Sequence, residues 1–299
     1  MTPPLPPDEF RSAPFAPMNA APPDSDELDA LLRLLDDDTP PVRERVAARI
    51  ALCSGDLSPW FATHPRPLSA QEHQLLSEML RPPRRAALTR EWLVAGADGP
   101  ALPEAWEMLE SVLRALSDFL HDGITPRQSL ADGLDRLAAE ATASGVSDEM
   151  ALRRFLFESK HFKGNQDEYN DPRNSDLAWS IATGRSNPIG LCLIYMLVAR
   201  RMQLRVEGVN FPGHFLCRIY QEGYPLIIDC FDGGQLHLQD TLMEKESDLT
   251  RQQRTQLRHS ADPRSILVRI LNNLVTAFRE TKRDEDAALI EQLRSPLVR

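Results

Sequence analysis

Apolar residues recur every three or four positions along most of this chain, the spacing that places them on one face of an α-helix. The pattern begins at residue 26, and Pro40 and Pro41 open a second apolar run. Residues 26–52 therefore predict a helical hairpin similar to one HEAT-type repeat unit. Proline-rich breaks separate further short helices, and we expect residues 26–103 to form a helical N-terminal region.

The most hydrophobic helix is predicted at residues 188–201, with the sequence PIGLCLIYMLVARR. Asn187 is a favourable N-cap, and Pro188 suits the first helical position. Apolar side chains occupy nearly every direction around this helix, so we expect it to be buried on all sides at the centre of its domain.

Three strands are expected after this helix, at residues 205–210, 214–220 and 225–229, with a hairpin turn at residues 221–224. The helical spacing returns near residue 267 and again at residues 284–293. The fold class is therefore α+β, with a core at residues 104–260 that contains a small antiparallel sheet, and with a C-terminal helical pair at residues 261–299.

The hairpin brings a histidine and an aspartate to one face of the sheet. If the turn is centred between Glu222 and Gly223, Leu216 faces Asp229, and His214 is the diagonal neighbour of Asp229. Diagonal pairs lie about 7–8 Å apart at the backbone, so long side chains can meet. An aspartate that orients a histidine is the general-base half of a nucleophile, histidine and acid triad.

The four cysteines are too few and too scattered for a disulfide framework. Cys217 and Cys230 fall on the sheet face opposite His214, where they are interpreted as small core residues. A zinc site built from His214, Cys217, Cys230 and His237 would need ligands from both faces of a sheet to converge on one point. We therefore expect no metal and no cofactor.

The net charge and the length of the apolar runs limit the kinds of partner that we expect. The chain has 44 acidic and 34 basic residues and a net charge of −10, which repels the phosphate backbone, so no nucleic-acid partner is expected. No apolar run reaches the roughly 18–20 residues of a membrane span. Residues 1–25 are proline-rich and are predicted to be a disordered tail without the features of a signal peptide, which favours a cytoplasmic location.

Several segments together resemble the SirB-type transglutaminase-like proteins of bacteria: NDPRNSDL (170–177), NPIGLCLIY (187–195), PGHFL (212–216) and IIDCFDGG (227–234). The resemblance implies a papain-like core, in which a cysteine at the start of a central helix is followed by a histidine and an acid on adjacent strands. His214 matches the family's histidine, and Asp229 matches its acid. Asn174 and Ser175 are interpreted as caps and turn formers, with a place in the cleft as the alternative.

The nucleophile departs from that pattern. The helix start, Asn187 to Gly190, carries no thiol, and SirB-type relatives commonly have a serine where this chain has Gly190. The nearest thiol is Cys192, about one turn inward, where the influence of the helix dipole fades.

Two hypotheses about function follow from this departure. The first is a degenerate, non-catalytic relative that binds a protein or peptide partner. The second is an acyl transferase or amide hydrolase in which Cys192 attacks, His214 takes the proton and Asp229 holds the imidazole.

Overall fold

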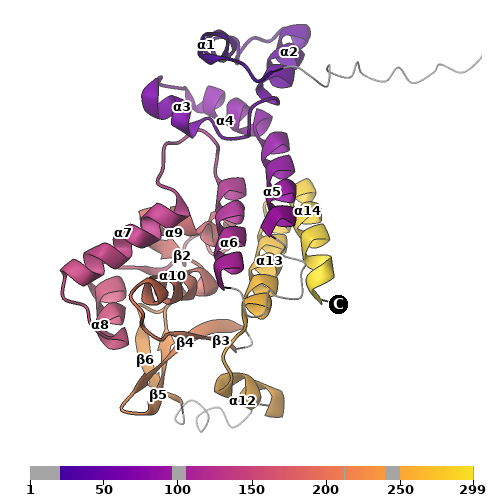
Figure 1. Cartoon of the computed structure of the whole chain (residues 1–299). Helices are drawn as coiled ribbons and strands as arrows, with labels where there is room; N and C mark the ends of the chain where they lie inside the picture. The colour runs from indigo at the N-terminus through magenta and orange to yellow at the C-terminus, as the bar shows by residue number, and fades with distance from the viewer. Residues whose placement is uncertain (1–20, 96–105, 212, 240–249, 299) are drawn as a thin grey trace, which may run out of the picture.

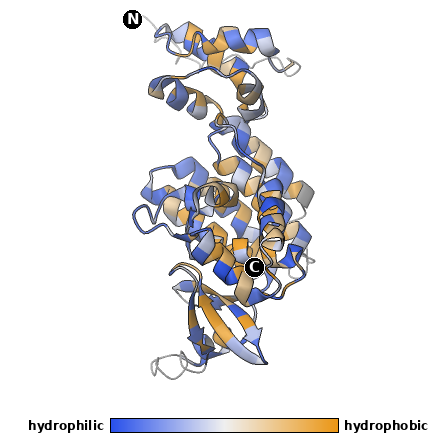
Figure 2. Cartoon of the chain, turned by 90° about the vertical axis from the view of Figure 1, so that its left-hand side faces the viewer, coloured by the Kyte–Doolittle hydropathy of each residue, from blue (hydrophilic) through white to orange (hydrophobic). Residues whose placement is uncertain are grey.

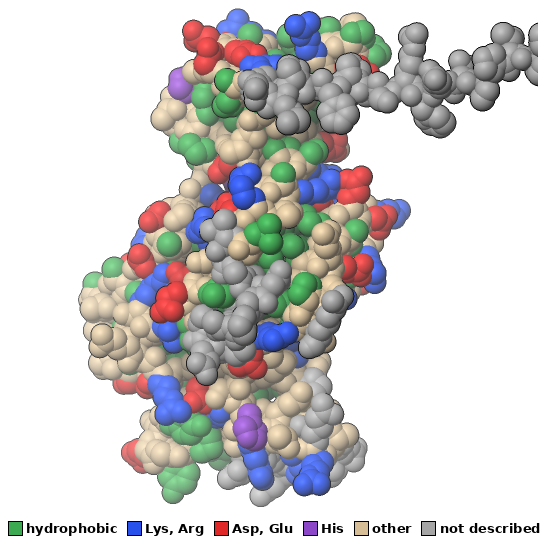
Figure 3. Space-filling view, turned by 45° about the vertical axis from the view of Figure 1, so that its right-hand side comes forward, with side chains coloured by type: hydrophobic (Ala, Val, Ile, Leu, Met, Phe, Trp, Pro, Cys, Tyr) green, Lys and Arg blue, Asp and Glu red, His purple; other side chains and the backbone are tan. Residues whose placement is uncertain are grey.

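The first N-terminal helices and the sheet lie at opposite ends of the molecule, with most other helices between them and the helix at residues 251–258 beside the sheet (Figure 1). The computed structural model describes residues 21–95, 106–211, 213–239 and 250–298. Acidic and basic side chains are interspersed over the face shown in Figure 3. Most of the predicted tail lies outside the described residues, and the first helix begins at Ser25.

The described part of the N-terminal region, residues 21–95, is largely helical. The predicted hairpin consists of α1 (Ser25–Leu32) and α2 (Pro40–Ile50), and α3 (Ser58–Thr63), α4 (Ala70–Met79) and α5 (Arg81–Ala95) follow. This region has a small hydrophobic core of its own, which contains Leu32, Ile50 and Leu76.

The central layer is built around α10 (Pro188–Arg201), whose residues from Pro188 to Ala199 are all buried, as predicted. The helices of this layer that precede it are α6 (Trp106–Leu120), α7 (Leu130–Ala143), α8 (Glu149–Arg153), which continues into a π-helical turn at Arg154–Ser159, and α9 (Leu177–Thr183). The predicted C-terminal pair consists of α13 (Pro263–Glu280) and α14 (Asp284–Arg294). None of the helices in the described ranges is long and apolar enough to cross a membrane.

The main sheet is antiparallel in the order β3 (Glu207–Phe211), β4 (His214–Gln221), β5 (Tyr224–Asp229) and β6 (Gln235–Leu238). Sequence patterns predict the first three strands but not β6. One sheet face packs on α10, and the other packs on α12 (Arg251–Arg258) through Val209, Leu216 and Leu257. Apolar residues follow the strands at this end of the molecule (Figure 2). A second, parallel pair joins β1 (Lys163–Gly164) to β2 (Arg185–Ser186).

The register of the β4–β5 hairpin is the predicted one. Glu222 and Gly223 have φ values of 51° and 85°, as a two-residue type I′ turn requires. Cys217 pairs with Ile228, so odd-numbered residues of β4 face α10 and even-numbered residues face away from it.

The cap of α9 differs from the expectation. Asn174 and Ser175 lie in a 3₁₀ turn, Pro172–Ser175, so the helix starts later, and Asp176 is its N-cap. The Asp176 carboxylate accepts a hydrogen bond from the Trp179 N–H and is paired with Arg127 at 2.9 Å. Burial raises the pKa of Asp176, and the positive charge of Arg127 opposes that rise.

The substitution Arg127→Ala tests this buried pair. It leaves a buried carboxylate without its cation, which should lower the free energy of unfolding by about 3–5 kcal/mol, as measured by urea denaturation. Arg136→Ala, which removes the more exposed pair with Glu140, is the control and should cost about 0–1 kcal/mol. Equal losses from the two variants would show that the Arg127–Asp176 pair does not hold α9 in place.

Candidate functional site

His214 and Asp229 meet as the register predicts. His214 Nε2 lies 2.8 Å from Asp229 Oδ2, and the backbone N–H groups of Phe231 and Asp232 donate to Asp229 Oδ1. The hydrogen bond to Asp229 raises the pKa of His214 above its ordinary value, against the effect of partial burial. Burial alone would raise the pKa of Asp229, but the hydrogen bond and charge of His214 and the two N–H groups outweigh it and lower that pKa.

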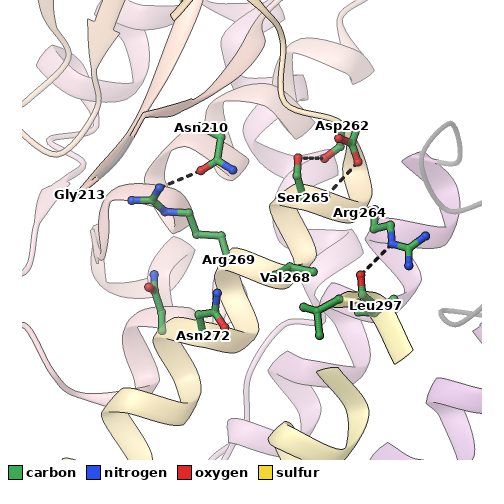
Figure 4. A pocket seen from close by; sticks show the side chains of 11 residues that line it. Asn210, Gly213, Asp262, Arg264, Ser265, Val268, Arg269, Asn272 and Leu297 are labelled. Atoms are coloured by element: carbon green, nitrogen blue, oxygen red, sulfur yellow. Dashed lines mark hydrogen bonds between the residues drawn. The ribbon is translucent and has the colours of Figure 1, made fainter. Parts of the chain in front are cut away.

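An open groove lies near the start of β4, and its lining includes Gly213, the residue before His214, but neither His214 nor Asp229. It has a volume of about 670 Å³ and lies between Gly213 and the first half of α13. Its lining combines polar and charged side chains, among them Asn210, Asp262, Arg264 and Arg269, with the apolar Val268, Leu297 and Val298. Figure 4 shows the Arg269 guanidinium extending from α13 toward Asn210.

A smaller hollow of about 100 Å³ continues along α13. It is lined by Tyr169, Ser175, Asn187 and Thr276, and it shares Asn273 with the larger groove. Because Asn187 is the N-cap of α10, the polar face of α13 connects the strand that carries His214 with the start of the central helix. Ser175 lines this hollow, whereas Asn174 is buried and holds the loop by donating to the carbonyl oxygens of Glu168 and Tyr169.

Cys192 lies in the core, and its charge contributes to raising the pKa of His214. Its side chain is 0% exposed, and its Sγ lies 3.5 Å from the carbonyl oxygen of Phe215. Within the described ranges, no hydrogen bond joins Cys192 to His214. The reason is the parity of β4, since Phe215 and Cys217 face α10 while His214 belongs to the alternate set of residues.

Cys192 instead meets the two other buried cysteines. The Sγ atoms of Cys192, Cys217 and Cys230 all lie within 4.8 Å of one another. Burial would raise the pKa of Cys192, but hydrogen bonds from Cys217 and Cys230 and the nearby charge of His214 lower it to about 6. The pKa values of Cys217 and Cys230 are raised well above the ordinary value, chiefly by burial. Sequence parity predicts the burial of Cys217 and Cys230 but not this meeting with Cys192.

The start of α10 has no room for a side chain at Gly190. A Cβ built there would lie 2.1 Å from Ser186 Oγ and 3.1 Å from the carbonyl oxygen of Asn174. Ser186 is fully buried, donates to that carbonyl oxygen and accepts from Ser180. The Ser186 hydroxyl therefore occupies the space into which a nucleophile at position 190 would extend.

Comparison with known families places the site in a matched region. Residues 128–272 match the family model described as the transglutaminase-like superfamily. This part of the chain is similar to that superfamily. It includes Cys192, His214 and Asp229, and it extends into α13 as far as Asn272.

Curated relatives match parts of this chain. A UPF0162 protein of Xylella fastidiosa (strain Temecula1) is 39% identical over 145 residues, which cover 46% of this chain and 51% of the relative. A UPF0162 protein of Pseudomonas aeruginosa is 31% identical over 144 residues, 47% of this chain and 49% of the relative. Mouse F-box only protein 21 is 34% identical over 82 residues, 27% of this chain and 13% of that protein.

The chain thus spans about half the length of the UPF0162 relatives that it matches. No solved structure matches it.

Arg269 is the site residue that sequence reasoning missed. Its Nη1 donates to Asn210 Oδ1 and to the carbonyl oxygen of Phe211, both at 2.8 Å. Burial lowers the pKa of Arg269, and the nearby groups Tyr169 and Cys192 oppose that effect. Arg269 lies in α13, which the sequence predicts from its apolar spacing. Nothing in the local sequence indicates that this arginine contacts β3, which comes much earlier in the chain.

The pairing of His214 with Asp229 can be measured by NMR titration of the imidazole. Asp229→Asn keeps an oxygen acceptor for the backbone N–H groups but removes the charge, so the pKa of His214 should fall toward 6.5. Because the folded-state pKa is raised, the stability contributed by His214 is fully present below its unfolded pKa and is lost as the pH rises through the folded pKa. Asp232→Asn is the control, and an equal shift in that variant would contradict the pairing.

The packing at Gly190 gives a second test. Gly190→Ala should destabilise the domain by about 1–3 kcal/mol through overpacking, and the loss should shrink when Ser186→Ala removes the obstructing hydroxyl. Gly133→Ala is the matched control in a helix, because its nearest neighbour would lie 3.4 Å away. That control should be neutral or stabilising by up to about 1 kcal/mol. Strictly additive losses at positions 190 and 186 would refute the steric account.

Proposed function

We propose that the region similar to the transglutaminase-like superfamily is a SirB-type, non-catalytic member with a papain-like core, which binds an extended segment of a protein or peptide in the groove along α13. The observation that supports the proposal is the difference in exposure between the thiol and the histidine. Cys192 is fully buried, with its Sγ against the carbonyl oxygen of Phe215, while the side chain of His214 is 29% exposed. An attacking thiolate must reach both its base and the substrate.

The lining of the groove suits a peptide backbone. Asn210 of β3 and Asn272 and Asn273 of α13 line the groove with amide groups, and such groups can pair with the N–H and C=O groups of an extended chain. The two ends of the groove lie at Gly213 and at the cap of α10. An extended segment laid along α13 would therefore pass both His214 and Asn187.

The charges around the groove favour an acidic group in that segment. Arg264 and Arg269 line it, and the raised pKa of His214 makes its ring cationic over a wider pH range. Asp229 holds His214 through Nε2, and Nδ1 has no hydrogen-bond partner among the described residues. A protonated Nδ1–H can therefore donate to a carboxylate of the bound segment.

One observation supports the catalytic alternative. The pKa of Cys192, at about 6, would make the thiol a thiolate at neutral pH. For that thiolate to act, Phe215 and the start of β4 would have to move away from α10. The amide hydrolase or acyl transferase hypothesis thus requires a second conformation of the domain, in which Cys192 is exposed to the substrate and to His214.

We further propose that the C-terminal pair works with the core, because α13 forms one wall of the groove. The N-terminal region at residues 26–103 has a separate small core. In this division the tail and the N-terminal helices are additional parts of the chain, and the binding function belongs to residues 104–299. The proposal includes neither a nucleic-acid nor a membrane partner.

Fluorescence anisotropy with a library of labelled extended peptides tests the binding function. Peptides with an acidic side chain or a free carboxyl terminus should bind better than their amide counterparts, and their affinity should fall as the pH rises through the raised pKa of His214. Arg269→Gln should weaken binding at least about tenfold, as expected for the loss of a charge-assisted contact worth roughly 1.5–3 kcal/mol.

Matched controls lie on the same elements. Arg279→Gln changes another arginine of α13, one that is paired with Glu291, and His237→Ala changes a histidine of β6; both should bind as the unmodified chain does. Equal losses in Arg269→Gln and Arg279→Gln would argue against the groove. Hydrolysis or cross-linking of a generic amide substrate that is lost in Cys192→Ala would overturn the non-catalytic assignment.

A further inference from the structure

Three buried sulfur atoms lie together between α10 and the sheet. Cys192 comes from the helix, Cys217 from the middle of β4 and Cys230 from the position after β5. Each is 0% exposed, and the three Sγ atoms lie within 4.8 Å of one another. All three cysteines are free thiols, so each can act as a ligand once its proton is lost.

We propose that Cys192, Cys217 and Cys230 form a trigonal thiolate site for a soft monovalent metal ion of the copper(I) type. This site is distinct from the peptide groove, because the cysteines face α10 and the groove lies along α13. With metal–sulfur bonds of roughly 2.3 Å, a planar three-sulfur site has edges of about 4 Å. The sulfur atoms therefore need to move inward by less than about 1 Å.

The ligand set selects the metal. Thiolates favour soft ions such as copper(I), whereas zinc takes four ligands in a tetrahedron. Among the described residues, the group contains three sulfurs and no histidine or carboxylate as a fourth ligand. The surrounding side chains include Phe215 and Ile228, which are fully buried and apolar. A three-coordinate ion fits this environment, because the surrounding side chains supply no fourth ligand and the carbonyl oxygen of Phe215, 3.5 Å from Cys192 Sγ, is a hard oxygen that a soft ion does not favour.

The charge of the loaded site can be offset nearby. On binding, each S–H bond gives way to a sulfur–metal bond and its proton passes to solvent, so three thiolates with one monovalent ion carry a net charge of −2. Arg269 and His214 both act electrostatically on Cys192. These two cations lie on the groove side, so they can stabilise the negative site without ligating the metal.

Copper K-edge X-ray absorption on the full-length chain tests the proposal. Copper(I), supplied as its acetonitrile complex under nitrogen, is added while the reduced chain refolds, so that access through the core does not decide the result. After competition with a copper(I) chelator, we expect one copper per chain with three sulfur neighbours at a single distance. A shell of nitrogen or oxygen neighbours, or preferential retention of zinc in a parallel sample, would overturn the proposal.

Single cysteine substitutions test which residues bind the copper ion. Cys192→Ser, Cys217→Ser and Cys230→Ser should each weaken copper binding at least about tenfold, because loss of a ligand costs no less than loss of an outer-shell partner. Cys53→Ser is the matched control in the N-terminal core and should bind as the unmodified chain does. Copper that is retained by the three cluster variants but lost in Cys53→Ser would refute the site. If a cluster variant does not fold by circular dichroism, the absorption spectrum of the unmodified chain decides.

Discussion

Burial of α10 on every side is the constraint on which the rest of the domain depends. A helix with no solvent-facing side must be covered by other elements, and α7, α8, α9 and the inner face of the sheet do this. Close approach of the sheet requires small residues at the contact. Gly208 is one of them, since a Cβ there would lie 2.9 Å from the ring of Phe215 and 3.3 Å from Met196. The three cysteines of the contact are likewise small, and the same packing gathers their sulfurs.

The same constraint divides the chemistry of the domain in two. Residues of β4 that face α10 are sealed from solvent, and this places Cys192 and Cys217 in a dry layer. His214, at the first position of β4, belongs to the alternate set and is partly exposed, paired with Asp229. At the start of α10, Ser186 fills the space beside Gly190. The buried thiol and the partly exposed His214–Asp229 pair therefore differ in their access to solvent, although Cys192 and His214 still act on each other through their charges.

Local patterns in the sequence predict a large part of this arrangement. The bounds of α10 follow from Asn187, Pro188 and a continuous apolar run, and the His214–Asp229 pair follows from one hairpin turn. The fourth strand escapes prediction because it is a short edge strand, Gln235–Leu238, without an apolar alternation long enough to recognise. Local patterns also do not predict contacts between elements that are distant in the sequence. Parity shows which face Cys217 occupies but not that Cys192 lies opposite, and nothing local links Arg269 to Asn210, which is 59 positions away.

The accessibility of Cys192 in the folded chain tests the central claim most directly. The native, reduced chain is treated with iodoacetamide near neutral pH, and the rate of labelling at each cysteine is followed by peptide mass spectrometry. The account predicts that Cys53, which is half-buried, is labelled first, and that Cys192, Cys217 and Cys230 react only after denaturation. Rapid, stoichiometric labelling of Cys192 before Cys53 would contradict it and would show that the thiolate is open to substrates.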